Sequence, residues 1–96
     1  MSFDKGQFDA NIAAAVGDDP TLVAELRGAF LSSARRCHDL LGRSRCDANW
    51  QYTAWRLKSI AASFGESDVQ RLAEEAALGA PGDPVILRQI GDALAV

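Results

Sequence analysis

The sequence predicts an all-α fold, an antiparallel up-down four-helix bundle with an additional short N-terminal helix. Apolar residues recur every three or four positions through most of the chain, and no segment shows the sustained alternation of a strand. Asp-Pro pairs at residues 19–20 and 83–84 each provide an N-cap followed by proline at the first helical position. The connections between the periodic segments are short, which favours antiparallel neighbours around one core.

The first two helices are predicted from apolar spacing. Phe8, Ile12 and Val16 lie four residues apart and indicate a short helix over residues 7–16, which needs support from the others. A long amphipathic helix over residues 20–42 follows the Asp19 cap. Its predicted core positions are Leu22, Leu26, Ala29, Phe30, Ser33, Cys37 and Leu40.

Three more helices complete the predicted domain, which comprises residues 1–96. Asp47 is expected to cap the helix 47–64, which Gly65 stops. The run from Ser67 to Gln70 fits a capping box for the helix 67–79, and Asp83 caps the helix 83–95. Their predicted core positions are Trp50, Thr53, Leu57, Ile60, Ala61, Phe64, Val69, Leu72, Ala73, Ala76, Leu87, Ile90 and Leu94.

Charge and composition restrict the function classes. The net charge of −3 gives no global reason to bind nucleic acid or an anionic membrane. No apolar run approaches the ~18 residues of a membrane span, and the N-terminus lacks the pattern of a signal peptide, so we expect a cytoplasmic protein. Cys37, His38 and Cys46 supply at most three soft ligands, so neither a metal nor another cofactor is predicted. No carboxylate pair, nucleophile–base couple or phosphate-binding loop predicts an enzyme.

Trp55 does not fit the core pattern. At ~100° per residue it points roughly 160° away from the apolar stripe of its own helix. Tryptophan is enriched as an interface anchor, which indicates a partner-binding surface. Two alternatives stay open: Phe3 or Phe8 packs across the indole, or Trp55 is one of the single exposed apolar residues that need no function. The outward face also carries Ala48, Gln51, Ser59 and Ala62, flanked by Tyr52 and Lys58.

The segment from Ala54 to Gly65, AWRLKSIAASFG, resembles the signature of bacterial histidine-phosphotransfer (HPt) domains. That signature reads Ala-His-x-Leu-Lys-Gly, followed by small residues, an aromatic or aliphatic residue and Gly. The likeness extends over about residues 20–95. Two positions depart from it, because Trp55 stands in the place of the histidine and Ser59 in that of the glycine. The matching residues are Ala54, Leu57, Lys58, Ala61 and Gly65, with further likeness at Phe30, Leu31, Val69, Leu72, Ala73 and Ala76.

The resemblance implies a role in a two-component phosphorelay. In the family, the exposed histidine exchanges a phosphoryl group with a receiver-domain aspartate. An indole nitrogen only donates hydrogen bonds and has no lone pair for attack on phosphorus, so Trp55 cannot perform this step. We therefore expect a non-phosphorylatable HPt-like protein, a monomer or weak dimer, that binds a response-regulator receiver or a histidine kinase. Its expected partner-binding residues are Gln51, Trp55, Lys58, Ser59 and Ala62.

The positive charge of Lys58 would complement the carboxylates of a receiver active site. Arg56 and the basic residues of the long helix, Arg27, Arg35, Arg36 and Arg43, could enlarge this positive patch or be ordinary solvated charges.

Two other functions remain open. His38, the only histidine, is expected to point away from the apolar stripe of its helix, and Gly42 follows one turn later. The chain could therefore be an active phosphocarrier that uses His38. Alternatively, Trp55 could pack in a symmetric dimer or beneath the N-terminal helix, in a structural bundle without a signalling role.

Overall fold

In the computed structural model, which describes residues 2–95, the chain is all-helical and contains no strand within that range. This agrees with the predicted all-α class. The helix bounds lie within two residues of those expected from the sequence, and residues 1 and 96 of the predicted domain lie outside the described part. The helices are α1 (Lys5–Val16), α2 (Pro20–Gly42), α3 (Asp47–Ser63), α4 (Ser67–Leu78) and α5 (Pro84–Ala93).

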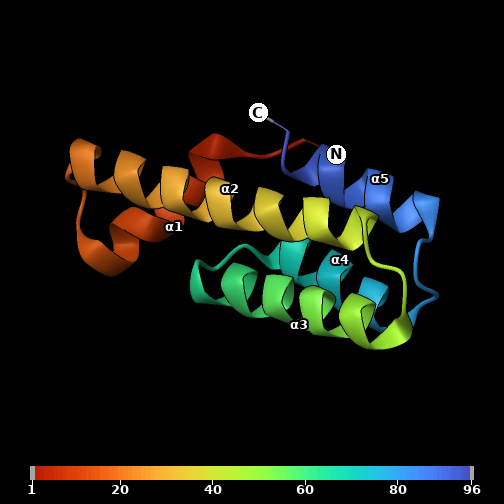
Figure 1. The fold of residues 1–96 in the computed structure, drawn as a ribbon. Helices are drawn as coiled ribbons and strands as arrows, with labels where there is room; N and C mark the ends of the chain where they lie inside the picture. The colour runs from red at the N-terminus through yellow and green to blue at the C-terminus, as the bar shows by residue number, and fades with distance from the viewer. Residues whose placement is uncertain (1, 96) are drawn as a thin grey trace.

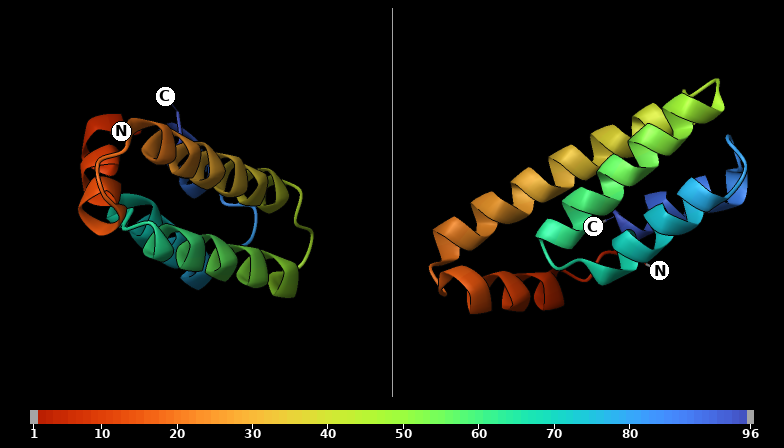
Figure 2. Two further views of the ribbon diagram at one scale, coloured as in Figure 1. Left: turned by 90° about the vertical axis from the view of Figure 1, so that its left-hand side faces the viewer. Right: turned by 90° about the horizontal axis from the view of Figure 1, so that it is seen from below.

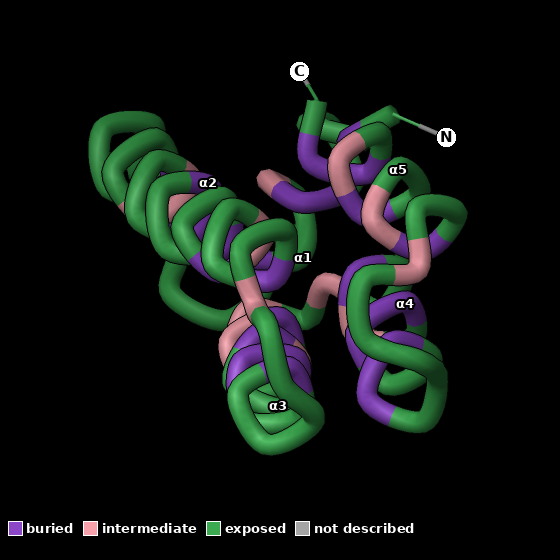
Figure 3. The backbone as a smooth tube through the Cα atoms, turned by 45° about the vertical axis from the view of Figure 1, so that its right-hand side comes forward, coloured by how far each residue is buried: buried purple, intermediate pink, exposed green. Residues whose placement is uncertain are grey.

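Helices α2 to α5 lie side by side and run in alternating directions (Figures 1 and 2). α2 packs against α3 and α5, and α4 packs against the same two helices. The first helix, α1, packs against α2 and crosses the end of the assembly where α2 begins (Figure 2). Each of α2 to α5 therefore buries one side against two neighbours and keeps its other side exposed (Figure 3).

Two of the four predicted N-caps are present. An Oδ1 atom of Asp19 accepts a hydrogen bond from the Thr21 backbone N–H at 3.0 Å, and Asp83 does the same for Val85 at 2.9 Å. The prolines that follow these residues occupy the first helical position, where the N–H that proline lacks would have no partner within the helix.

The other two predicted N-caps, at Asp47 and Ser67, are wrong. The N-cap residues are Cys46 and Glu66, and neither side chain bonds the helix terminus. Capping requires a residue that still lies outside the helix. Asp47 and Ser67 are already the first helical residues, one position too late to cap. Asp47 still places its carboxylate in the first turn, where the helix dipole favours a negative charge.

The end of α3 forms a Schellman motif at Gly65. The backbone of Gly65 has a φ of +71°, which a residue without Cβ adopts without strain. Its N–H donates to the Ala62 carbonyl at 3.2 Å, and the Glu66 N–H donates to the Ala61 carbonyl at 2.8 Å. This turn, over the three residues between Ser63 and Ser67, reverses the chain and sets α4 beside α3.

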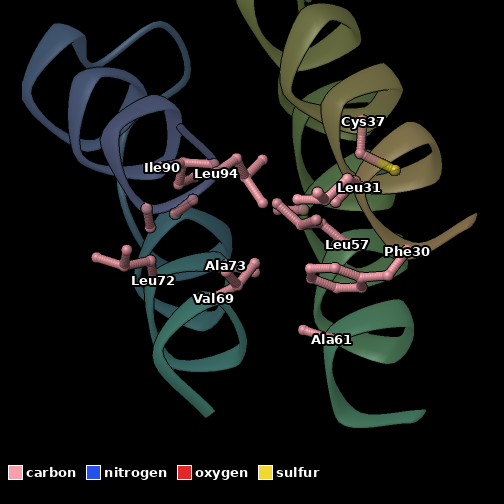
Figure 4. Close-up of a cluster of buried hydrophobic side chains, with 14 of the residues drawn as sticks. Phe30, Leu31, Cys37, Leu57, Ala61, Val69, Leu72, Ala73, Ile90 and Leu94 are labelled. Atoms are coloured by element: carbon pink, nitrogen blue, oxygen red, sulfur yellow. The ribbon is translucent and has the colours of Figure 1, made fainter. Parts of the chain in front are cut away.

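The core fills the space between the α2–α3 pair and the α4–α5 pair. Leu31 and Leu57 point from one side toward Ile90 and Leu94 on the other (Figure 4). All four are buried. The largest buried side chain, Trp50, donates its indole N–H to the Ala76 carbonyl of α4 at 2.6 Å. An indole N–H needs such a partner when it is buried, so this bond fixes α3 against α4.

A cluster of four phenylalanines attaches α1 to the other helices. The Phe8 ring lies 5.1 Å from Phe30 of α2 and 6.1 Å from Phe64 at the end of α3, centroid to centroid. Phe3 lies 5.4 Å from Phe8. These separations are in the range of favourable aromatic pairs. The short helix therefore gains from tertiary packing the stability that its length alone does not provide.

The buried face of α2 differs from the predicted one. Leu22, Ala29, Ser33 and Leu40 were expected in the core but are exposed. At ~100° per residue, the buried face is rotated by roughly 80° from the predicted stripe. α2 carries apolar residues on two adjacent columns, and contacts with α1, α3 and α5 decide which column is covered. The buried residues of α2 are Val23, Phe30, Leu31, Ala34, Cys37 and Leu41.

Candidate partner-binding surface on α3

Trp55 lies on the outer side of α3 and is 42% exposed. Phe3 and Phe8 do not cover it, because both belong to the phenylalanine cluster at the end of the molecule. On its own helix, Ser59 lies one turn further on and turns its hydroxyl back to the Trp55 carbonyl at 3.1 Å. A small, inward-bonded neighbour leaves that side of the indole accessible to a partner.

The outer face of α3 also exposes the small and polar residues that the sequence placed there. Gln51, Ser59 and Ala62 are all exposed and lie on the same side of the helix as Trp55. We call Gln51, Trp55, Ser59 and Ala62 the α3 face. It is an aromatic side chain surrounded by short ones, which allows another protein to approach the backbone of α3 closely.

Lys58 lies at the edge of the α3 face and interacts with two groups. Its Nζ atom lies 4.6 Å from the centroid of the Trp55 ring, a cation–π distance. The same ammonium lies 3.5 Å from a Glu74 carboxylate oxygen of α4. Lys58 therefore covers part of one side of the indole, and its charge is already partly matched by the protein. An ion pair this accessible contributes little to stability, so a partner carboxylate can replace Glu74 at small cost.

The arginines of the expected positive patch divide into two groups. Arg27 bonds the Asp9 carboxylate of α1 at 2.6 Å, and Arg35 donates to the Leu94 carbonyl at the end of α5 at 3.0 Å. These two join helices to one another and do not enlarge the patch. Arg36, Arg43 and Arg56 lie along the boundary between α2 and α3 instead.

The sequence predicts that His38 points away from the apolar stripe of its helix. In the structure it lies against α5 instead. It is partly buried, and its Nε2 atom lies 2.8 Å from the Leu87 carbonyl of α5. A carbonyl only accepts, so this contact requires the tautomer with the proton on Nε2, and the lone pair of the neutral ring then lies on Nδ1. The difference follows from the rotated face of α2, which brings His38 to the flank that packs against α5.

Gly91 of α5 provides the space that the His38 ring occupies. A Cβ atom added at Gly91 would lie 3.1 Å from Cε1 of His38 and 3.3 Å from its Nε2. At Gly28 in α2, an added Cβ meets nothing within 4 Å.

Gly28→Ala is therefore expected to stabilise the protein by about 0.5–1 kcal/mol, the usual gain of alanine over glycine in a helix. Gly91→Ala is expected to lose that gain, because its Cβ displaces His38 from Leu87. We expect the two variants to differ by about 1–2 kcal/mol in urea unfolding. Equal stabilisation by both would contradict the close packing of His38 on Gly91.

The two cysteines differ in accessibility. Cys37 is buried and Cys46 is exposed at the start of α3. Burial raises the pKa of the Cys37 thiol, although the positive charges of Arg56 and Arg36 act in the opposite direction. Cys37 is thus held as an unreactive thiol in the core.

Two residues of the exposed surface were not assigned to the site from the sequence. Tyr52, recognised there only as a flanking residue, is 66% exposed, and Leu40, expected in the core, is 40% exposed. Both line a hollow between α2 and α3. The outward position of Tyr52, one turn before Trp55, was the available signal. No feature of the sequence indicated that Leu40 is exposed, because either of the two apolar columns of α2 is suited to face the core.

The α3 face exposes an indole among small and polar side chains, and position 55 holds no group for phosphoryl transfer. Within residues 2–95, no three His, Cys, Asp or Glu side chains lie together as a metal site would require. None of the described helices combines the length and apolarity needed to cross a bilayer. Comparisons of the chain with protein families, with curated proteins and with solved structures give no match.

Proposed function

We propose that this protein is an HPt-like component of a two-component phosphorelay, and that it binds a receiver domain or histidine kinase without carrying phosphate at the usual site. The observation that carries the proposal is the exposed Trp55 indole on the outer side of α3. In the HPt signature, which residues 54–65 resemble, this position holds the exposed phosphoacceptor histidine. The proposed function is cytoplasmic and regulatory, with no catalytic step.

The helix arrangement supports this proposal. α2 to α5 alternate in direction, and each contacts two of the others, as in an up-down four-helix bundle. α1 then corresponds to an additional helix at one end. We propose that the fold is such a bundle, in which the α3 face lies where an HPt domain meets its receiver.

The proposed binding mode is recognition of a helix face. Trp55 would bury its exposed part against an apolar part of the partner, because an aromatic anchor removes a large area from water at a small entropic cost. Ser59 and Ala62 allow close approach, and Gln51 can hydrogen-bond at the margin. Lys58 would exchange Glu74 for a partner carboxylate, which favours a receiver active site with its cluster of acidic residues.

Replacement of Trp55 by alanine is expected to weaken binding to the cognate receiver or kinase by about 30-fold or more, since a central aromatic anchor contributes at least ~2 kcal/mol. The measurement is calorimetric titration of purified receivers and kinases from the same genome. Val85→Ala, an exposed apolar residue of α5, is the matched control and is expected to change the affinity less than about twofold.

Three outcomes would contradict the proposal. The first is that no receiver or kinase binds, and the second is that Trp55→Ala and Val85→Ala bind equally well. The third is phosphate transfer from a phosphorylated receiver that His38→Ala abolishes, which would identify an active phosphocarrier. Light scattering of the protein alone tests the structural alternative, in which Trp55 is buried in a stable dimer.

A further inference from the structure

A groove follows the boundary between α2 and α3, beside the α3 face. It consists of two hollows that share Leu40 as a lining residue. The larger, of about 280 Å³, is lined by Leu40, Arg43, Ser44, Asn49, Tyr52 and Thr53. The smaller, of about 110 Å³, is lined by Ser33, Arg36, Cys37, Leu40, Arg56 and Ile60. We call this feature the α2–α3 groove.

The α2–α3 groove is positive although the protein as a whole is acidic. Three arginines line it, and neither hollow is lined by an Asp or Glu side chain, in a chain with a net charge of −3. Arg43 pairs with Asp39 on the exposed side of α2. Arg36 and Arg56 form no ion pair with any carboxylate of residues 2–95. Two guanidinium groups beside the smaller hollow are therefore available to an incoming anion.

Apolar side chains line the same hollows as these arginines. Leu40 and Tyr52 are among the large hydrophobic residues that the described surface exposes, and both border the larger hollow. Ile60 is partly buried at the smaller one. An apolar strip with cations along it is complementary to a segment that carries aliphatic side chains and carboxylates together. The positive charge of the arginines distinguishes this groove from an ordinary exposed apolar patch.

We propose that the α2–α3 groove binds an acidic amphipathic segment of a partner protein. Carboxylates of that segment would pair with Arg36 and Arg56, and with Arg43 in place of Asp39. An aliphatic side chain would enter the larger hollow between Leu40 and Tyr52. This inference goes beyond the proposed function, because it does not require the partner to be a receiver domain or a histidine kinase.

A polyanion without apolar groups fits the groove less well. A nucleic-acid duplex keeps its bases stacked inside the helix, so it would leave Leu40 and Tyr52 without apolar partners. A protein segment satisfies both the charges and the apolar strip.

The test is a titration of the full-length, ¹⁵N-labelled protein with a capped synthetic peptide of glutamate and leucine. The peptide has roughly 14 residues, or four helical turns, with the leucines on one side. We expect amide shifts confined to the groove residues and an affinity that falls as salt is added. The sequence-matched peptide with lysine in place of glutamate is expected to bind at least tenfold more weakly.

Charge reversal then identifies the site. The double variant Arg36→Glu/Arg56→Glu is expected to weaken peptide binding by at least tenfold, because it places like charges opposite one another. Arg88→Glu on α5 lies outside the groove and changes the charge in the same sense, so it is expected to change the affinity less than about threefold. Tyr52→Ala, which keeps all charges, is expected to weaken binding while retaining the salt dependence.

Several results would overturn the inference. They are the absence of shifts up to about 1 mM peptide, shifts located elsewhere, or equal losses in Arg88→Glu and the double variant. Tighter binding of duplex DNA or of phosphatidylserine-containing vesicles at the same residues would assign the groove to another class of ligand. Circular dichroism of each variant, measured beforehand, separates loss of binding from loss of folding.

Discussion

Trp50→Ala is expected to lower the free energy of unfolding by about 3–5 kcal/mol, the usual cost of truncating a fully buried aromatic residue. Trp50 is fully buried, and its indole N–H donates to the Ala76 carbonyl at 2.6 Å. The substitution removes the packing between α3 and α4 and leaves a cavity in the core. It also takes a hydrogen-bond partner from Ala76, whose carbonyl keeps only the Gly79 N–H at 3.2 Å.

Two companion variants separate these contributions. Trp50→Phe keeps most of the apolar volume and loses the hydrogen bond, so it is expected to cost about 1–2 kcal/mol. Trp55→Ala truncates an exposed tryptophan of the same helix and is expected to cost less than about 1 kcal/mol. Urea unfolding followed by circular dichroism measures all three. Equal losses for Trp50→Ala and Trp55→Ala would contradict their assignment to opposite sides of α3.

Phe30→Ala is expected to cost a similar amount, about 3–5 kcal/mol, and to weaken the attachment of α1 in particular. Phe30 is fully buried and contacts the other three phenylalanines, at centroid distances of 5.1 Å to Phe8, 5.4 Å to Phe64 and 6.2 Å to Phe3. Without its ring, α1 keeps the Arg27–Asp9 ion pair, the contact of Phe8 with Phe64 and the burial of Ile12. A helix of this length is marginal by itself.

Hydrogen exchange provides the specific measurement for this variant. Amides of α1 are expected to lose more protection than those of α4, because local opening no longer has to break the phenylalanine cluster. Phe30→Leu, which keeps an apolar side chain in the site, is expected to cost clearly less and to preserve the protection of α1. A uniform loss of protection across all helices would mean that α1 and the rest of the core unfold as one unit.

The stabilities involved decide how these variants are studied. Domains of this size have unfolding free energies of about 5–15 kcal/mol. Trp50→Ala or Phe30→Ala alone could therefore remove most of the free energy of unfolding. Measurements near the temperature of maximum stability, on the order of 10–20 °C, keep the largest folded fraction. The conservative variants Trp50→Phe and Phe30→Leu remain informative if the alanine variants do not fold.

The local chemistry of the sequence determined the helices and several of their ends. Proline after Asp19 and Asp83 fixed two helix starts, and Gly65 fixed the end of α3, because each acts through its own backbone and immediate neighbours. The outward direction of Trp55 followed in the same way, since α3 has one clear apolar stripe and Trp55 lies opposite it.

Tertiary packing decided what local rules left ambiguous. α2 offers two adjacent apolar columns, and only its contacts with α1, α3 and α5 determine that Leu41 is buried and Leu40 exposed. The same rotation places His38 on Leu87 and opens the groove beside Tyr52. The pairing of Trp50 with Ala76 and of Arg35 with Leu94 joins residues distant in the chain. Periodicity within one helix specifies an angle about its axis, whereas the burial of each side depends on where the neighbouring helices lie.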